Sequence, residues 1–159
     1  MHEAWLRARA PGYDDLTEDE REALKTFLFL WSLFEANALA EQGGPASIII
    51  AARRLSVRHG GLPPNVGAAL AYFRDRYIGE GAPNDRFAAL NFRDRDRRPL
   101  VEEVLTGRRE APDDQAAAVF LIVYRLRNNL FHGAKWAYGM AGQYDNFHHA
   151  NQVLMEALD

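Results

Sequence analysis

The sequence contains no cysteine, which excludes a disulfide framework and a zinc site with thiolate ligands. It also lacks an N-terminal stretch in which basic residues precede an apolar run, the pattern of a secretory signal peptide. The longest apolar run, residues 116–124, is far shorter than the roughly 20 residues that a membrane-spanning helix needs. From these absences we expect a soluble cytoplasmic protein without a membrane anchor.

An excess of positive charge is missing as well. The net charge of -3 argues against a protein that coats nucleic acid through its overall field, so any RNA contact should be local. The basic run at 53–59 can in principle bind phosphate, but such a run is usually a solvated face. In residues 79–99 the charges of both signs nearly cancel, and we interpret this segment as a mobile, salt-bridged connection.

The remaining composition is that of one ordinary globular domain. The 159 residues, 48% of them hydrophobic, suffice for a single core. Apolar residues recur at helical spacing, and no repeat, low-complexity tract or strand pair is apparent. We therefore predict an all-α domain, a helical bundle spanning residues 1–159. The expected segments are an N-terminal arm over 1–16 docked by Trp5 and helices over 17–42, 46–59, 66–78, 100–105, 112–132 and 145–158.

The first long helix should begin at a capping box formed by Thr17 and Glu20. One of its faces is apolar but also carries Glu35, where an apolar residue would be expected. Two interpretations stay open. Either Glu35 is buried and pairs with an arginine of the helix over 112–132, because a buried charge needs a counter-charge, or the opposite face is the more buried one and Glu35 is solvated. That opposite face carries Phe29, Leu30 and Leu33.

The helix over 112–132 is predicted to be central, because residues 116–124 are apolar all round and must be enclosed by other helices. Its last turns then carry several polar residues, which are costly to bury unless they are partnered or functional. These residues are Arg125, Arg127, Asn128, Asn129 and His132. Gly133 favours a left-handed helix end, so His132 should lie in a final turn that is open to a ligand.

The segment Arg127-Asn128-Asn129-Leu130-Phe131-His132 resembles the motif of the HEPN superfamily, helical bundles that carry an arginine, usually followed by a polar residue, and a histidine a few positions later. The resemblance implies a homodimer whose motif helices face each other across a cleft. In active members this cleft cuts RNA without a metal ion or other cofactor. The resemblance also implies a role as a toxin or in defence against phage, with an antitoxin or another protein as possible partner.

The resemblance assigns the catalytic roles to three residues. His132 would transfer protons near neutral pH, and Arg127 would bind the phosphate through its charged fork. Asn128 would orient either the phosphate or His132. In a supporting role, Arg125 would pair with Glu35.

Two alternatives stay open: which arginine acts with His132, and whether the protein is catalytic at all. Residues five apart on a helix point about 140° from each other, so Arg127 and His132 do not share a face, whereas Arg125 and His132 nearly do. We prefer Arg127 because Asn128 follows it. At a helix end, or in a cleft shared by two subunits, the two side chains can act together although they point in different directions. In the alternative, Arg127 and His132 only cap and salt-bridge a packed helix, and the protein is a non-catalytic module that binds RNA, a nucleotide or a protein partner.

Further candidates follow the central helix. Lys135 and Tyr138 are expected to contact RNA, the tyrosine by stacking on a base, although loop tyrosines more often pack against the bundle. His148 and His149 suggest a metal site only superficially, because adjacent residues on a helix point about 100° apart. We therefore predict no metal.

Overall fold

The computed structural model describes residues 2–39, 42–132 and 140–159, and these form eight α-helices, one 3₁₀ turn and one minimal hairpin. The all-α class is thus confirmed. The elements are α1 His2–Arg9, α2 Glu18–Ala38, α3 Pro45–His59, α4 Pro64–Tyr77, β1 Ile78–Gly79, β2 Ala82–Pro83, α5 Asp85–Ala88, the 3₁₀ turn η1 Asp94–Asp96, α6 Arg98–Leu105, α7 Pro112–Phe131 and α8 Tyr144–Leu158. Within the described ranges, no helix combines the length and apolar content needed to cross a membrane.

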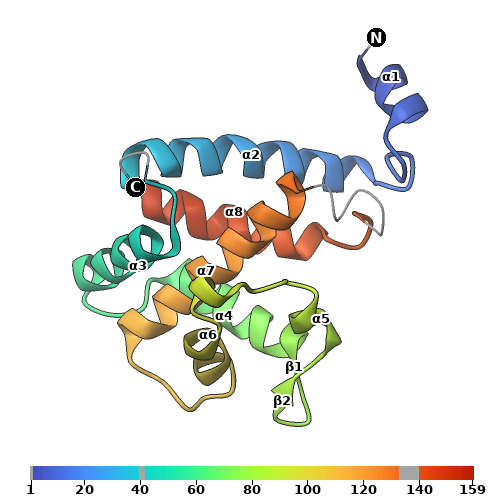
Figure 1. Cartoon of the computed structure of the whole chain (residues 1–159). Coiled ribbons are helices and arrows are strands. Elements are labelled where there is room, and N and C mark those ends of the chain that lie inside the picture. The colour runs from blue at the N-terminus through green and yellow to red at the C-terminus, as the bar shows by residue number, and fades with distance from the viewer. Residues whose placement is uncertain (1, 40–41, 133–139) are drawn as a thin grey trace.

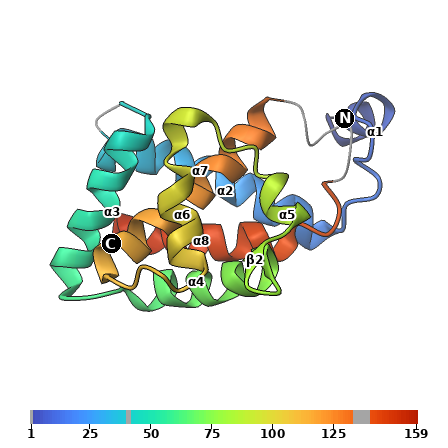
Figure 2. The same ribbon diagram turned by 60° about the horizontal axis from the view of Figure 1, so that its bottom comes forward.

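The central helix is α7, as predicted. Its residues 116–123 are buried on every side. Helix α3 packs along α7, and α4 and α6 add further contacts, while α2 and α8 lie side by side and α7 crosses them (Figure 1, Figure 2). One copy of the chain therefore encloses the apolar run completely, and this run does not require a second copy to cover it.

Helix α2 begins at the predicted capping box. Thr17 Oγ1 accepts the N–H of Glu20 at 3.2 Å, and Glu20 Oε2 accepts the N–H of Thr17 at 2.9 Å. The second carboxylate oxygen of Glu20 accepts the N–H of Gly142 and thereby ties α2 to the turn before α8. The helix ends at Ala38, earlier than predicted, and Pro45 begins α3.

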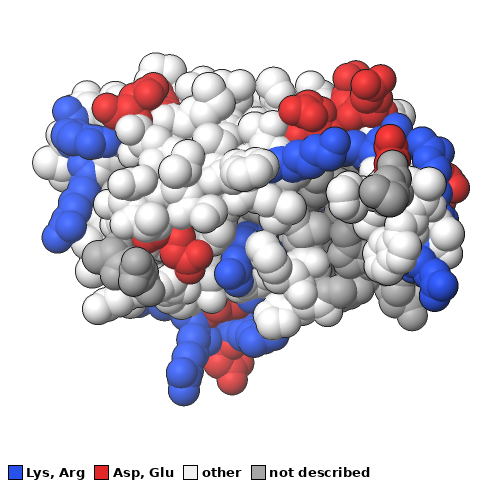
Figure 3. Space-filling view, turned by 90° about the horizontal axis from the view of Figure 1, so that it is seen from above, with Lys and Arg blue, Asp and Glu red and all other residues white. Residues whose placement is uncertain are grey.

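The buried face of α2 is the apolar face that also carries Glu35, extended on one side by Phe34. It carries Leu24, Phe27, Trp31 and Phe34. Phe29 is 76% exposed and Leu33 51% exposed, so the interpretation in which their face is the more buried one is wrong. Figure 3, which views the molecule from the side of α2, shows a broad area without charged residues. Helix α2 thus leaves an apolar, uncharged face in contact with solvent.

The expectation that the chain has no strand pair is wrong. Strands β1 and β2 pair in antiparallel register, with Gly79 opposite Ala82. The turn between them has Glu80 and Gly81 at positive φ, 52° and 78°, which is the backbone geometry of a tight hairpin. The rest of residues 79–99 is also more regular than the mobile connection that we expected, because it contains α5 and η1.

The N-terminal arm does not dock through Trp5. Residues 2–9 form α1, which stands off the bundle, and Trp5 is 64% exposed (Figure 1). Tyr13 and Leu16 are buried instead, and they connect this arm to the core. The position of the tryptophan therefore did not indicate which residues pack the N-terminal arm against the core.

Candidate functional site

The polar end of α7 is divided between two sides of the helix. Arg125 and Asn129 are one turn apart, face the segment between α5 and α6, and are both buried. Arg125 Nε donates to the carbonyl of Leu90 at 3.0 Å. Asn129 Nδ2 donates to the carbonyls of Ala89 and Leu90, both at 3.2 Å. This side of α7 therefore holds the backbone of a neighbouring segment and is structural.

The ion-pair partner of Arg125 is Asp96, and the pairing with Glu35 is wrong. One guanidinium nitrogen of Arg125 lies 2.8 Å from Asp96 Oδ2, and both side chains are almost fully buried. Burial lowers the pKa of Arg125, and the Asp96 carboxylate opposes that shift. Arginine stays charged in proteins, so the pair is a buried ion pair.

Glu35 lies elsewhere. Its carboxylate rests against the backbone of Gly43, in the connection between α2 and α3, where an added Cβ would collide with Oε1. Among the residues that the structure describes, no ion pair joins Glu35 to Arg125 or Arg127. Glu35 is half-buried rather than enclosed, so it does not need an arginine as counter-charge.

Arg127 lies on the other side of α7, between aromatic rings. Its guanidinium carbon is 4.6 Å from the ring centroid of Phe131 and 5.9 Å from that of Trp31 on α2. One guanidinium nitrogen donates to Asn128 Oδ1 at 3.0 Å, while the buried Nε has no hydrogen-bond partner among the described residues. Arg127 therefore keeps donor capacity that the described part of the chain does not use.

His132 caps α7 and has an exposed side chain. Its backbone N–H donates to the carbonyl of Asn128 at 3.0 Å. Within the described ranges, no hydrogen bond or ring contact joins the side chains of Arg127 and His132. The structure thus brings Arg127 and Asn128 together and leaves His132 pointing into solvent at the end of the same helix. Gly133, Lys135 and Tyr138 lie outside the described residues.

A cleft of about 470 Å³ opens beside Asn128. Tyr124 and Asn128 line its α7 wall. Opposite them stand Arg93 and Arg95, which flank and belong to η1, and both arginines are exposed. Residues 124, 128 and 132 follow one another at four-residue spacing, so the row that lines the cleft leads to His132. Sequence reasoning missed these arginines, because the alternating charges of residues 93–98 suggested that they neutralise one another.

Comparison with family models, curated proteins and solved structures finds no match for this chain. The HEPN resemblance therefore depends on residues 127–132 and on the helical fold.

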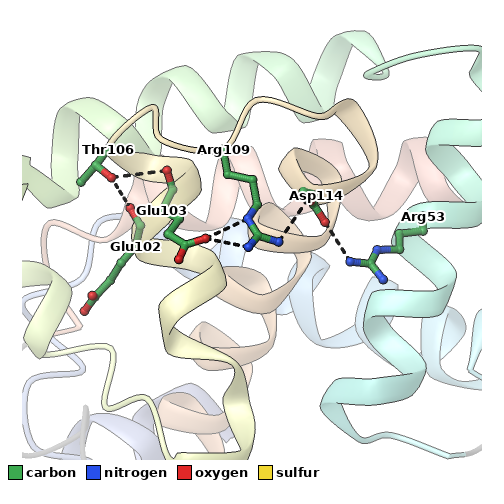
Figure 4. A network of polar contacts seen from close by, with 6 residues as sticks. All are labelled: Arg53, Glu102, Glu103, Thr106, Arg109 and Asp114. Carbon is green, nitrogen blue, oxygen red and sulfur yellow. Dashed lines mark hydrogen bonds and ion pairs between the residues drawn. The ribbon is translucent and has the colours of Figure 1, made fainter.

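The basic run of α3 is partly used in packing. Arg53 contacts Asp114 at 2.8 Å, at the N-terminal end of α7 (Figure 4). Asp114 also lies 3.4 Å from Arg109, which pairs with Glu103 at 2.8 Å. The other basic side chains of the run are exposed. Arg53 is thus part of an ion-pair network that joins α3, α6 and α7, and it is not a free phosphate ligand.

The two histidines of α8 make ring contacts. His149 stacks on Tyr72 of α4 with 4.4 Å between ring centroids, and His148 stacks on Tyr144 at 5.7 Å. The two imidazoles are nearly perpendicular, at 78°. Burial lowers the pKa of His149, and the neighbouring His148 adds to this. The contact between His149 and Tyr72 packs α8 against α4, whereas His148 and Tyr144 both lie on α8 and are exposed.

Proposed function

We propose that this protein is a metal-independent endoribonuclease of the HEPN type that acts as a homodimer. The observation that supports this most is the state of Arg127. A guanidinium with one hydrogen bond and two aromatic neighbours is held in place, and its buried Nε has no hydrogen-bond partner within the described ranges. The unpaired Nε is not peculiar to Arg127, because the Nε atoms of Arg53, Arg74 and Arg76 are also buried without a hydrogen-bond partner among the described residues. What supports the proposal is that Arg127 is held beside Asn128 near the end of the helix that leads to His132, where the rest of its guanidinium can bind a phosphate.

The reaction that suits these residues is attack by the RNA 2′-hydroxyl on the adjacent phosphorus. The 2′-oxygen forms a bond to phosphorus, the bond from phosphorus to the 5′-oxygen breaks, and the products carry a 2′,3′-cyclic phosphate and a 5′-hydroxyl. One proton leaves the 2′-hydroxyl and one is delivered to the 5′-oxygen. Imidazole suits both transfers near neutral pH, and a fixed guanidinium stabilises the charge on the phosphorane.

Each residue then has a defined role. His132 transfers protons, and two copies of it across a dimer cleft provide an acid and a base. Arg127 binds the phosphate. Asn128 fixes the guanidinium through the hydrogen bond at 3.0 Å. A toxin or phage-defence role, with an antitoxin as partner, is the biological setting that the HEPN resemblance suggests.

The test is cleavage of single-stranded RNA by the purified protein in excess EDTA. We expect cleavage to persist, and to be lost in Arg127→Ala and His132→Ala while both variants keep the wild-type melting temperature. General acid–base catalysis contributes about 10²- to 10⁴-fold in rate, so the loss of His132 is easily measured. DNA of the same sequence should stay intact because it lacks the nucleophile.

His59→Ala is the matched control, since His59 is also an exposed histidine at the end of a helix. This variant should cleave RNA like the wild type. Full activity in His132→Ala, or loss of activity in EDTA, would overturn the mechanism. Binding of RNA without cleavage would favour the alternative, a non-catalytic module for RNA, a nucleotide or a protein partner.

A further inference from the structure

The segment over residues 89–96 is fixed to α7 by buried polar contacts. Arg125 and Asn129 hold its backbone carbonyls, as described above. Asp96 is turned inward, where it pairs with Arg125 at 2.8 Å and also accepts the N–H of Arg93 at 2.8 Å. Because these groups are buried, the polypeptide that carries Arg93 and Arg95 has a defined position relative to α7.

The inward position of Asp96 changes the charge balance of this segment. Residues 93–98 read Arg-Asp-Arg-Asp-Arg-Arg, four arginines and two aspartates, within a segment over 79–99 whose charges nearly cancel. In the structure Asp96 is neutralised by Arg125, and Arg98 pairs with Glu102 at 2.6 Å. Arg93 and Arg95 are exposed, line the cleft, and form no ion pair with any described residue. Two free guanidinium groups therefore face the cleft, with Asp94 as its exposed acid.

We infer that this cleft holds the single-stranded RNA strand next to the cleaved bond, with Arg93 and Arg95 on backbone phosphates and the ring of Tyr124 against a base. This inference rests on the proposed function. Guanidinium forks suit phosphate oxygens, and an aromatic ring accepts any base, so the cleft binds RNA without strong sequence preference. The row from Tyr124 through Asn128 leads the strand toward His132. Asp94 opposes binding by repelling phosphate.

The test is a binding titration with a short single-stranded RNA that carries 2′-O-methyl at every nucleotide. This oligonucleotide lacks the attacking hydroxyl, so its binding is measured without cleavage, by fluorescence anisotropy over a series of salt concentrations. Each phosphate contact contributes about 0.7 to the slope of log affinity against log salt for single strands. The double variant Arg93→Ala/Arg95→Ala should thus lower that slope by about 1.4 and weaken binding. Asp94→Asn should tighten binding.

The matched control is Arg54→Ala/Arg58→Ala, which removes the same charge from exposed positions on α3. It should leave the slope unchanged. An unchanged slope in Arg93→Ala/Arg95→Ala, or an equal fall in the control, would overturn the inference. The two proposals fail separately. Cleavage of unmodified RNA by a double variant that binds normally refutes the cleft alone, while weakened binding in the double variant without cleavage by the wild type supports the cleft and refutes the nuclease.

Discussion

Among single residues, Arg125 and Asp96 form the contact on which the polar end of α7 depends. Two charges removed from water stabilise a fold only when each compensates the other, and the loss of either leaves a bare buried charge. Arg125 also donates to a backbone carbonyl, so Asp96 and Leu90 share its guanidinium. This pair connects the position of η1 to the helix that carries the candidate catalytic residues.

We predict that Asp96→Ala lowers the free energy of unfolding by about 3–5 kcal/mol, because Arg125 is then buried without its counter-charge. Glu35→Ala is the control. Glu35 is half-buried and contacts no arginine of α7 among the described residues, so this variant should unfold close to the wild type. Urea denaturation followed by circular dichroism measures both values. Equal stabilities for the two variants would show that the buried pair is not what holds this segment.

The sequence predicts that Arg125 needs an acid, but it does not identify which one. Glu35 stood out because it interrupts an apolar face, whereas Asp96 was hidden among alternating charges whose sum is small. The choice depends on where a segment 29 residues away from Arg125 is folded, and helical periodicity does not contain that information. For the same reason, Arg93 and Arg95 were not predicted as part of a cleft.

At the scale of secondary structure, helical spacing and capping residues predict most elements. These signals are local, because each depends only on residues that are near one another in the sequence, and the tertiary structure does not override them. They are the cap at Thr17, the prolines that begin α3, α4 and α7, and the apolar faces. The hairpin was missed because its strands have two residues each, too few for any alternation. Helix α7 itself has two polar sides, one bound to the protein and one open, which the spacing of its residues does not reveal.

The N-terminal end of α2 gives a prediction on pH dependence. Burial raises the pKa of Glu20, but the hydrogen bonds from Thr17 and Gly142 together lower it by more than burial raises it. The pKa of Glu20 is therefore below its usual value of 4.5. The unfolded chain then binds a proton at a higher pH than the folded one. The stabilisation by Glu20 is therefore fully present above about pH 4.5 and is lost as pH falls through the folded pKa.

We expect Glu20→Gln to be less stable than the wild type at about pH 6, and this difference to shrink by about pH 3. Glu18→Gln removes an exposed acid from the same helix start and serves as the control, with a smaller difference at every pH. Thermal melts over this pH range measure both. A difference for Glu20→Gln that stays constant with pH would show that its carboxylate does not lose these hydrogen bonds on protonation.

For the whole molecule, the proposed dimer needs a surface, and the exposed apolar residues of α2 and of the end of α7 offer one. The apolar run of α7 is fully enclosed, so it leaves no patch for a partner. Phe29 and Leu33 of α2 are exposed, and Phe131, at the end of α7, is 58% exposed. Arg127 stacks on both Phe131 and Trp31, which connects the α2 side with the candidate site.

This surface suits a second copy of the same chain. Residues 26–34 of α2 carry no charge, so two such faces related by a twofold axis meet without repulsion between like charges (Figure 3). A stable interface buries about 800 Å² on each partner, which an exposed helix with its neighbours can supply. Because Arg127 contacts Trp31 of α2, each copy of Arg127 would lie next to the helix that forms such an interface.

We predict that the protein sediments at twice the chain mass at low micromolar concentration, and that Phe29→Glu/Leu33→Glu sediments as a folded monomer. The single chain should stay folded, because both side chains already face solvent in one copy, and its melting temperature should not depend on protein concentration as that of a dimer does. Val57→Glu, on the exposed face of α3, introduces a charge at a residue that is 77% exposed and should leave the dimer intact. If the dimer is essential, the double variant also loses RNA cleavage while it retains Arg127 and His132. A wild-type protein that is monomeric at every concentration, yet cleaves RNA, would show that one chain alone completes the site.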